Sequence, residues 1–335
     1  MPGYDYDDHE RFDRPRRYTR PRTKNRPSYS DAAVAVVVTV DRGRFTCRLA
    51  DEDVTVTAMK SRPLGRKGVV VGDRVRLVGD VSGTEDTLAR IVEVEDRRTV
   101  LRRTADDTDP VERVIVANAD QLVVVTALAD PEPRPRLIDR ALVAAYDAGL
   151  DPLLCLTKPD LADPEKLLVT YRSLGVPYVV VQRGHDPVDL RARLAGRTSV
   201  LVGHSGVGKS TLVNALVPGA GRAIGDVNEV TGRGRHTSTS ALMLRLPSYD
   251  GGYAGWIVDT PGIRSFGLAH VDPAHLIDAF PDLAEATEDC PRGCTHAESE
   301  PECGLDEAVA AGTVDPERVD SLRRLLASRE TAEGD

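Results

Sequence analysis

The chain has 335 residues, of which 41% are hydrophobic and 29% charged, values ordinary for a globular protein of two or three domains. A formal net charge of -9 argues against indiscriminate binding to nucleic acid, and the longest apolar runs are too short to cross a bilayer. The first residues lack the apolar core of a secretory signal, so we expect a cytoplasmic protein without membrane contact.

Residues 1–32 contain a basic stretch. Between Arg14 and Arg26 lie seven basic residues and no acidic one, with prolines between them. Such a segment cannot bury enough apolar surface to fold alone, so we expect a disordered arm. The arm is either a solvated tail without a partner or a segment attracted to phosphate backbones.

Residues 33–100 show the pattern of a small β-domain. Short β-prone runs separated by glycines indicate a small closed barrel, and an OB-fold is one barrel of this size. The expected strands are Val34 to Val40, Arg44 to Leu49, Val54 to Ala58 and Asp73 to Val78. A basic loop is expected from Lys60, Arg62, Arg66 and Lys67; it is either a chance feature or a nucleic-acid contact. Phe45 is the only aromatic residue of this segment, which disfavours stacking on bases.

Residues 105–269 alternate between apolar strands and helices, which predicts an α/β fold with a mostly parallel sheet covered on both faces. The expected strands are Leu122 to Leu128, Leu153 to Thr157, Val176 to Val181, Ser199 to Gly203 and Trp256 to Asp259. The expected helices are Leu137 to Gly149 and Pro164 to Gly175. Both end at glycine, and the second begins with proline.

Residues 203–210 read GHSGVGKS and fit the phosphate-binding pattern G-x-x-x-x-G-K-[ST]. The motif lies between the apolar strand SVLVG and the helix-like KSTLVNAL, which is the context that a phosphate loop requires. Glycines let backbone N–H groups turn inward around phosphates. We expect Lys209 to neutralise the β- and γ-phosphates and Ser210 to ligate Mg²⁺. The other candidate phosphate-binding residues are Gly203, Ser205, Gly206, Val207, Gly208 and Thr211.

Residues 259–262 read DTPG at the end of the expected strand WIVD. In a P-loop protein this is the position of a carboxylate that holds Mg²⁺ through water and of a glycine amide that faces the γ-phosphate. Asp259 and Gly262 are the candidates for these roles. As an isolated tetrapeptide DTPG would be an ordinary turn, so its place downstream of the phosphate loop carries the prediction.

Residues 157–160 read TKPD, again after an expected strand. The Asp160 carboxylate can accept hydrogen bonds from N1 and the exocyclic amine of guanine, a donor pair that adenine lacks. Each charge-assisted bond of this kind contributes about 1.5–3 kcal/mol, enough to select GTP. Lys158 would pack its stem along the base plane, and Thr157 completes the candidate base-binding set. Alone, TKPD is equally a helix-capping turn, and the similar Asn118-Ala119-Asp120 lacks the lysine and is interpreted as structural.

Residues 270–335 are expected to form a helical, cysteine-bearing domain. Cys290, Cys294, His296 and Cys303 follow the spacing C-x₃-C-x-H-x₆-C. Three thiolates and one imidazole make a closed tetrahedral zinc site of the structural type. Cytosolic thiols stay reduced, so disulfides are not expected. The remaining alternative is a set of unpaired surface cysteines.

The order of these motifs is unusual. In ordinary small GTPases the base-reading motif comes last, whereas here TKPD precedes the phosphate loop. With this order and its flanking domains, the chain from residue 33 onward resembles the RsgA (YjeQ) family of circularly permuted GTPases. The matching segments are TKPD at 157–160, GHSGVGKS at 203–210, GRGRHTSTS at 232–240, DTPGIRSFGL at 259–268 and the cysteine cluster.

The resemblance implies an enzyme that hydrolyses GTP to GDP and phosphate, with one structural Zn²⁺ and with Mg²⁺ beside GTP. It implies that the partner is the small ribosomal subunit with its rRNA, bound during a late step of subunit maturation and released by hydrolysis. We expect a monomer. Because DTPG leads directly into the zinc domain, loss of the γ-phosphate would loosen a segment tethered to that domain.

The resemblance also assigns the first switch to GRGRHTSTS. Thr237 or Thr239 would reach Mg²⁺, and His236 would orient the attacking water, because Ile263 stands where many GTPases carry a glutamine. His236 is alternatively a switch residue that only contacts phosphate or RNA. The chain departs from the family in three places: a shorter threonine run, the slightly different cysteine spacing, and Gln182-Arg183-Gly184 in place of a Ser-Ala-like base-supporting loop.

Two other functions remain compatible with the sequence. One is a P-loop ATPase or kinase in which TKPD is a coincidence. The other is a zinc-dependent RNA-binding module whose nucleotide site is regulatory or vestigial, a hypothesis disfavoured by the retained P-loop lysine and serine.

Overall fold

The first five strands alternate buried and accessible side chains, as expected for a sheet with one face in a core. They are β1 (Ala33–Asp41), β2 (Arg44–Leu49), β3 (Thr55–Lys60), β4 (Arg74–Val78) and β5 (Ala89–Val94). β1 pairs with β2 and β4, β3 pairs with β2 and β5, and β4 pairs with β5. The five strands therefore close into a barrel, and the predicted OB-like barrel is confirmed.

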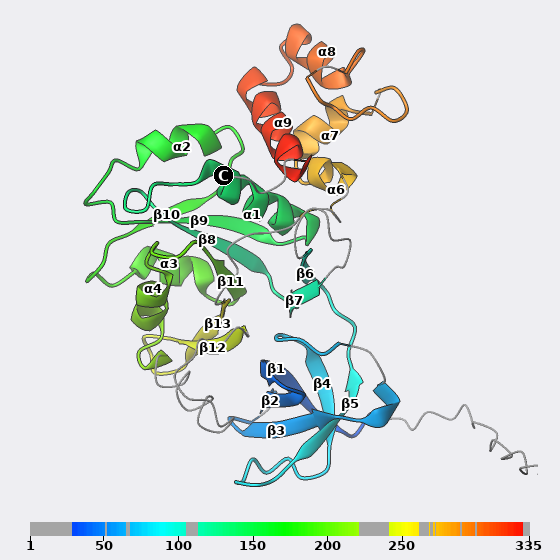
Figure 1. The fold of residues 1–335 in the computed structure, drawn as a ribbon, viewed down its shortest axis with the longest axis vertical. Helices are drawn as coiled ribbons and strands as arrows, with labels where there is room; N and C mark the ends of the chain where they lie inside the picture. The colour runs from blue at the N-terminus through cyan, green and yellow to red at the C-terminus, as the bar shows by residue number, and fades with distance from the viewer. Residues whose placement is uncertain are drawn as a thin grey trace, which may run out of the picture. The chain divides into compact units, whose positions relative to one another are not determined.

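The arrangement comes from a computed structural model that describes residues 29–50, 52–64, 68–104, 113–220, 241–260, 268, 271, 273–288, 290–298 and 300–330 (Figure 1). The described residues from Ala32 onward belong to one compact unit. Residues 1–28 of the expected arm, with its basic stretch, lie outside the described residues, as do Arg66 and Lys67 of the expected basic loop. Lys60 is the last residue of β3, and Arg62 is the first residue of the short helix η1 (Arg62–Leu64). The expected basic loop therefore starts later in the chain than predicted. None of the described helices is both long and apolar enough to span a membrane.

A two-residue turn joins β1 to β2. Asp41 pairs with Arg44, and the two residues between them, Arg42 and Gly43, have φ of 44° and 83°. A type I′ turn needs positive φ at both central residues, which glycine adopts freely. The turn sends Phe45 into the barrel core, where it is buried.

Strands β6 (Val100–Arg103) and β7 (Arg113–Ala117) form a hairpin that the sequence did not reveal. It spans the boundary that the sequence suggested between residues 100 and 105. The Asn118 amide donates to the Gly72 carbonyl (2.9 Å), and its Oδ1 accepts from the Arg98 N–H (2.9 Å). A Cβ on Gly72 would lie 2.0 Å from the Ala117 oxygen, so only glycine allows this approach of a barrel loop to β7. The structural interpretation of Asn118 is confirmed.

A second group of strands forms the predicted α/β sheet. These strands are β8 (Gln121–Ala127), β9 (Asp151–Thr157), β10 (Tyr178–Val181), β11 (Thr198–Val202), β12 (Leu242–Pro247) and β13 (Tyr253–Asp259). Their order is β10-β9-β8-β11-β13-β12, and every neighbouring pair is parallel except β12–β13. The prediction of a mostly parallel sheet is confirmed; strand β12, which also pairs with β1 at Thr39 and Leu242, was not predicted.

Helices cover both faces of this sheet. Successive residues of β8 alternate between two cores: Leu122 packs in the core that contains residues of α1 (Pro135–Asp147) and α2 (Glu165–Tyr171), and Val123 packs in the core of α3 (Val188–Leu194) and α4 (Lys209–Leu216). A strand buried on both faces is apolar at nearly every position, which explains the uninterrupted run QLVVVTA. α2 ends earlier than predicted because Arg172 to Gly175 form a turn, with the Gly175 N–H donating to the Arg172 carbonyl.

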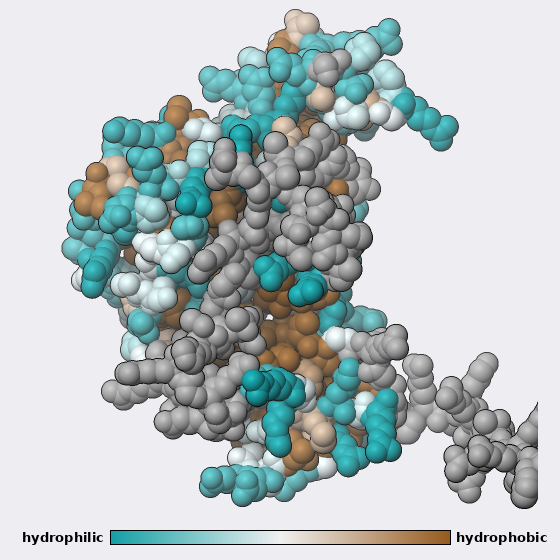
Figure 2. Space-filling model, viewed as in Figure 1, coloured by the Kyte–Doolittle hydropathy of each residue, from teal (hydrophilic) through white to brown (hydrophobic). Residues whose placement is uncertain are grey.

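The C-terminal body consists of α6 (Pro273–Asp278), α7 (Pro281–Ala286), α8 (Gly304–Ala311) and α9 (Pro316–Glu330). Its visible surface is mostly hydrophilic (Figure 2). Helix α9 packs on α1 through apolar residues and a polar seam. In this seam Arg324 Nε lies 3.1 Å from Asp139 Oδ2, and Arg140 Nη1 donates to the Ser328 carbonyl (2.8 Å). Burial raises the pKa of Asp139, and the charge of Arg324 opposes that rise.

We predict that Arg324→Ala lowers the free energy of unfolding by about 3 kcal/mol, because it leaves the buried Asp139 carboxylate without its cation. Urea denaturation followed by circular dichroism measures the loss. The double variant Asp139→Leu/Arg324→Leu should recover most of it. Arg136→Ala, which removes an exposed arginine of α1, should change stability by less than about 0.5 kcal/mol. An equal loss in Arg136→Ala would contradict the prediction.

Candidate functional site

Four parallel strands end at one edge of the sheet. β8, β9, β11 and β13 run in the same direction, so their carboxyl ends lie side by side. TKPD follows β9, the phosphate-loop motif follows β11, and Asp259 is the last residue of β13. In open α/β sheets ligands bind outside these carboxyl ends. The structure thus brings three segments that are far apart in sequence to one edge.

Glycines shape the loop between β11 and α4. A Cβ on Gly203 would lie 2.5 Å from the Val125 carbonyl oxygen, so the loop leaves the sheet in direct contact with β8. Gly206 and Gly208 have φ of 87° and 94°, values that glycine adopts without strain. Val207 is 3% exposed and anchors the loop in the core below. α4 then begins at Lys209, with its first backbone N–H groups unpaired within the helix, as an anion site requires.

The TKPD segment is hydrogen-bonded to the phosphate-loop motif. The Thr157 hydroxyl lies 2.6 Å from the Val207 carbonyl oxygen and 3.3 Å from that of Thr126, and it donates to the nearer one. Thr157 is buried, so this bond is shielded from water. Lys158 Nζ donates to the carbonyl of Asp130 in the loop after β8. The two neighbouring residues therefore link β9 to two other strand ends.

The Asp130–Pro131 segment was missed by the sequence analysis. Its peptide bond is cis, and a Cβ on Gly206 would lie 3.5 Å from the Pro131 ring. The segment therefore lies between Lys158 and the phosphate loop. The sequence carries a signal for a turn, because Asp-Pro and a second proline follow a buried strand, but nothing in it identifies the contact partners.

Lys209 and Asp259 form an ion pair across the edge. Their side chains are 13% and 11% exposed, so the pair is largely shielded from solvent. The neighbouring Thr260 hydroxyl donates to the Leu201 carbonyl (2.7 Å), which fixes the start of the DTPG segment against β11. A cation and a carboxylate suited to phosphate and to Mg²⁺ are thus held beside each other.

The remaining described candidates are exposed or half-buried. Ser205, Ser210, Thr211 and Asp160 are exposed, and Gly203 and Gly208 are half-buried. Asp160 lies in a turn after β9, in which the Leu161 N–H donates to the Lys158 carbonyl (3.1 Å). Gln182 follows β10, whose Val181 pairs with Thr157, so the segment that departs from the family pattern lies at the same edge. His236, Thr237, Thr239, Gly262 and Ile263 lie outside the described residues.

A second cluster lies in the C-terminal body. The ligand atoms of Cys290, Cys294, His296 and Cys303 all lie within 4.8 Å of one another. His296 Nδ1 is 3.6, 3.5 and 3.7 Å from the three sulfur atoms. Tetrahedral zinc with bonds of about 2.3 Å to sulfur and about 2.0 Å to nitrogen separates these atom types by about 3.5 Å. The four residues therefore fit a zinc ion.

The surroundings of the cluster agree with this fit. Burial lowers the pKa of His296, which favours the neutral imidazole that a metal binds. Burial and the neighbouring cysteines raise the pKa of the Cys294 thiol to about 11, so a cation is needed to hold several thiolates here. Arg323 Nε donates to the His296 carbonyl (3.0 Å), and the Gly304 N–H donates to Cys290 Sγ (3.2 Å). These bonds orient the ligands.

We predict that the purified protein contains one zinc ion per chain, measured by atomic emission, and that Cys294→Ser reduces this content by at least about tenfold. A strong chelator should lower the helical circular dichroism signal and the melting temperature of the wild type, because structural zinc contributes directly to folding. Arg292→Ala, an exposed change in the same loop, should keep its zinc. A metal-free wild-type protein with unchanged melting would refute the site.

Comparison with known proteins gives three consistent results. A family model described as RsgA GTPase matches residues 94–269. The Pseudomonas putida protein named small ribosomal subunit biogenesis GTPase RsgA is 44% identical over 223 residues, which cover 64% of this chain and 63% of that protein. A protein of the same name from Chlorobaculum parvum is 38% identical over 306 residues, which cover 88% of this chain and 94% of that protein.

Among solved structures, YjeQ from Thermotoga maritima matches with a TM-score of 0.65 at 27% identity, covering 89% of this chain and 98% of that one. A match over this share of the chain extends into the regions before and after the α/β sheet in sequence, so the three-part architecture is shared. Sequence and fold lead to the same assignment: the chain belongs to the RsgA GTPase family.

Proposed function

We propose that this protein is a GTPase that binds the small ribosomal subunit and hydrolyses GTP during a late step of its maturation, with hydrolysis driving release. The observation that carries the proposal is the meeting of TKPD, the phosphate loop and Asp259 at one strand edge. The P. putida and C. parvum relatives are named for this activity and this particle. Such a role belongs in the cytoplasm, and we propose that a monomer performs it.

Guanine selection is assigned to Asp160. Its exposed carboxylate would accept hydrogen bonds from N1 and N2 of guanine, with Lys158 beside the base plane. Thr157 has a positioning role in this scheme. Its hydrogen bond to the Val207 carbonyl fixes the distance between the base-reading segment and the phosphate loop.

Phosphate chemistry is assigned to the loop and the Lys209–Asp259 pair. Lys209 would move from Asp259 to the β- and γ-phosphates, while Ser210 and Asp259 would hold Mg²⁺, Asp259 through a water. Mg²⁺ would neutralise the charge that develops on the phosphates. Among the residues outside the described ranges, His236 would orient the attacking water, Thr237 would reach Mg²⁺, and the Gly262 N–H would donate to the γ-phosphate.

The flanking parts are assigned to ribosome contact. We propose a basic arm over residues 1–32, a barrel over 33–100, the GTPase domain over 105–269 and a zinc domain over 270–335. Within 33–100 no exposed aromatic side chain is found among the described residues, since Phe45 lies in the core, so contacts of the barrel with rRNA would be to backbone and shape. A structural zinc ion would hold Cys290, Cys294, His296 and Cys303 together.

Nucleotide state would reach the zinc domain by two connections. The segment after DTPG leads directly into that domain in the sequence. The second connection begins at Asp130, which accepts from Lys158, and continues through α1 to its seam with α9. GTP would therefore set the orientation that docks, and loss of the γ-phosphate would release it.

The base assignment makes a direct prediction. Asp160→Asn should weaken GTP binding by at least about tenfold and improve binding of xanthosine triphosphate, because an amide can donate to the O2 of xanthine where the carboxylate cannot. Fluorescent-nucleotide titration measures both affinities. Asp163→Asn, a nearby carboxylate that bonds only to its own backbone turn, is the matched control. Equal GTP and ATP binding by the wild type would support an unrelated P-loop ATPase instead.

The partner assignment predicts slow hydrolysis by the isolated protein and a large increase, at least about tenfold, when purified small subunits are added. Phosphate release under multiple turnover is the measurement. Lys209→Ala should abolish hydrolysis with and without subunits, because the phosphate charge is no longer neutralised. Rates that stay constant with every ribosomal particle would contradict the ribosomal role. Zinc-dependent subunit binding without any turnover would support the RNA-binding alternative.

A further inference from the structure

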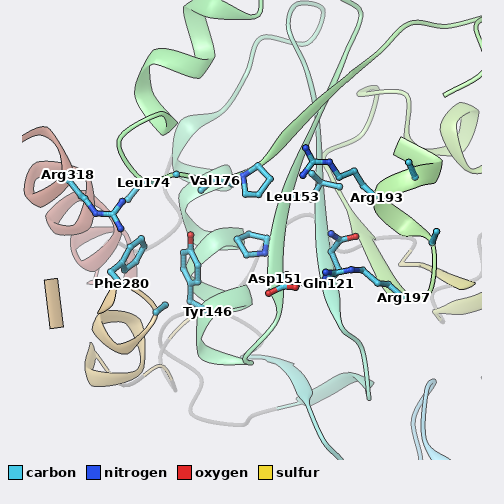
Figure 3. Close-up of a pocket in the computed structure, with 16 residues that line it drawn as sticks. Gln121, Tyr146, Asp151, Leu153, Leu174, Val176, Arg193, Arg197, Phe280 and Arg318 are labelled. Carbon is cyan, nitrogen blue, oxygen red and sulfur yellow. Dashed lines mark hydrogen bonds and ion pairs between the residues drawn. The ribbon is translucent and has the colours of Figure 1, made fainter. Parts of the chain in front are cut away.

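A cavity of about 450 Å³ lies at the opposite edge of the sheet from the candidate nucleotide site (Figure 3). Its floor is formed where β8 and β9 begin, by Gln121, Asp151 and Leu153. The volume is within the range of about 300–1,000 Å³ that is typical of small-molecule sites. The nucleotide motifs follow the carboxyl ends of these same strands, so the cavity is a separate place on the protein.

One end of the cavity is apolar. Tyr146 at the end of α1 and Phe280 before α7 contact each other edge to face, with ring centroids 5.0 Å apart. Leu174 and Val176 lie on the same side of the cavity as these rings (Figure 3). Such a wall accommodates a flat or aliphatic group of a ligand.

The other end carries hydrogen-bond donors. Arg193 of α3 is exposed, and it makes no hydrogen bond or ion pair with the part of the chain that the structure describes. Gln121 is buried, and its Oε1 accepts from the Ser199 hydroxyl (3.1 Å), which leaves its NH₂ group to donate. At the apolar end, burial raises the pKa of Tyr146 to about 12, so its hydroxyl keeps a proton that it can donate there.

The charged groups nearby leave a positive balance. Arg197 pairs with Asp151, which supplies the only carboxylate among the lining residues. Arg318 is paired with Asp282 and also donates to the Ser173 carbonyl (2.7 Å). The guanidinium of Arg193 therefore remains as a positive charge beside hydrogen-bond donors. The cavity has few acceptor groups that could bind a cationic ligand.

We propose that this cavity binds a small organic anion, a carboxylate or phosphate ester with a flat or aliphatic body. The anionic group lies among Arg193, Gln121 and Arg197, and the body lies against Tyr146 and Phe280. The acceptor atoms of such a ligand match the donors of the cavity, and its apolar part is removed from water. This assignment does not depend on the proposed GTPase function.

The site also has a consequence for the C-terminal body. Phe280 and Arg318 belong to that body, whereas Gln121, Tyr146 and Arg193 belong to the α/β domain. A ligand that contacts both sides stabilises their association in proportion to its binding. Occupancy of the cavity therefore strengthens the same association that Arg324 and Asp139 maintain.

The test uses the full-length protein and 1-anilinonaphthalene-8-sulfonate, an anion with a flat apolar body whose fluorescence rises on binding. Titrations are run with and without saturating GDP and Mg²⁺. We expect one saturable site in both conditions. Phenyl phosphate and phenylacetate distinguish the two ligand classes: displacement of the probe by either supports the site and identifies the preferred acid. Neither inorganic phosphate nor neutral N-phenyl-1-naphthylamine should compete at the same concentrations.

Variants locate the binding. Arg193→Glu should weaken probe binding by at least about tenfold, and Tyr146→Phe, which keeps the ring, by about threefold. Ala192→Trp introduces bulk from an exposed lining position on α3 and should also weaken binding. Arg90→Glu, an exposed change of the same kind on the barrel, should bind as the wild type.

The proposal is overturned if Arg193→Glu and Ala192→Trp both bind the probe as the wild type, if binding does not saturate, or if GDP displaces the probe. GTP hydrolysis is measured on the same preparations after purified small subunits are added. A wild type without hydrolysis but with the expected pattern of probe binding would reject the proposed GTPase function and keep this site. Hydrolysis by the wild type together with unaltered probe binding in the variants would support the proposed GTPase function and reject this site.

Discussion

Strands β8, β9, β11 and β13 are packed between two layers of helices, and polar side chains are largely excluded from their buried centres. The polar groups of these strands therefore collect where the strands end, and parallel direction puts four carboxyl ends together. The Lys209–Asp259 pair, Thr157 and the glycine loop all depend on this constraint. Motifs separated by about a hundred positions become neighbours, because their polar side chains lie at the strand ends and these ends meet at one edge of the sheet.

Permutation leaves this edge unchanged. The order of strands in space sets which motifs meet, while the order along the chain sets which motif is connected to which flanking domain. Thr157 illustrates the first point, because its buried hydroxyl joins the end of β9 to the phosphate-loop motif. The second point concerns the C-terminal body. It follows the DTPG segment in sequence, yet it is held by α9 against α1, the helix that begins beyond Asp130.

The C-terminal body is built from short helices, which have little core of their own. Its cysteine and histidine cluster has a geometry that fits one metal ion. The body is also joined to the α/β domain through the buried Asp139–Arg324 pair, and the cavity beside Phe280 and Arg318 lies along the same border.

The sequence by itself determined the local chemistry: the phosphate loop, TKPD, the cysteine spacing and the strand–helix alternation, because each depends on residues close together along the chain. It also indicated a barrel from short alternating strands. Tertiary structure decided the rest. The hairpin β6–β7 packed on the barrel, the strand β12, the Asp130–Pro131 contact and the Asp139–Arg324 seam rest on partners far away in sequence. No local pattern specifies such partners, since hydrogen bonds and packing between distant segments exist only once the sheet has assembled.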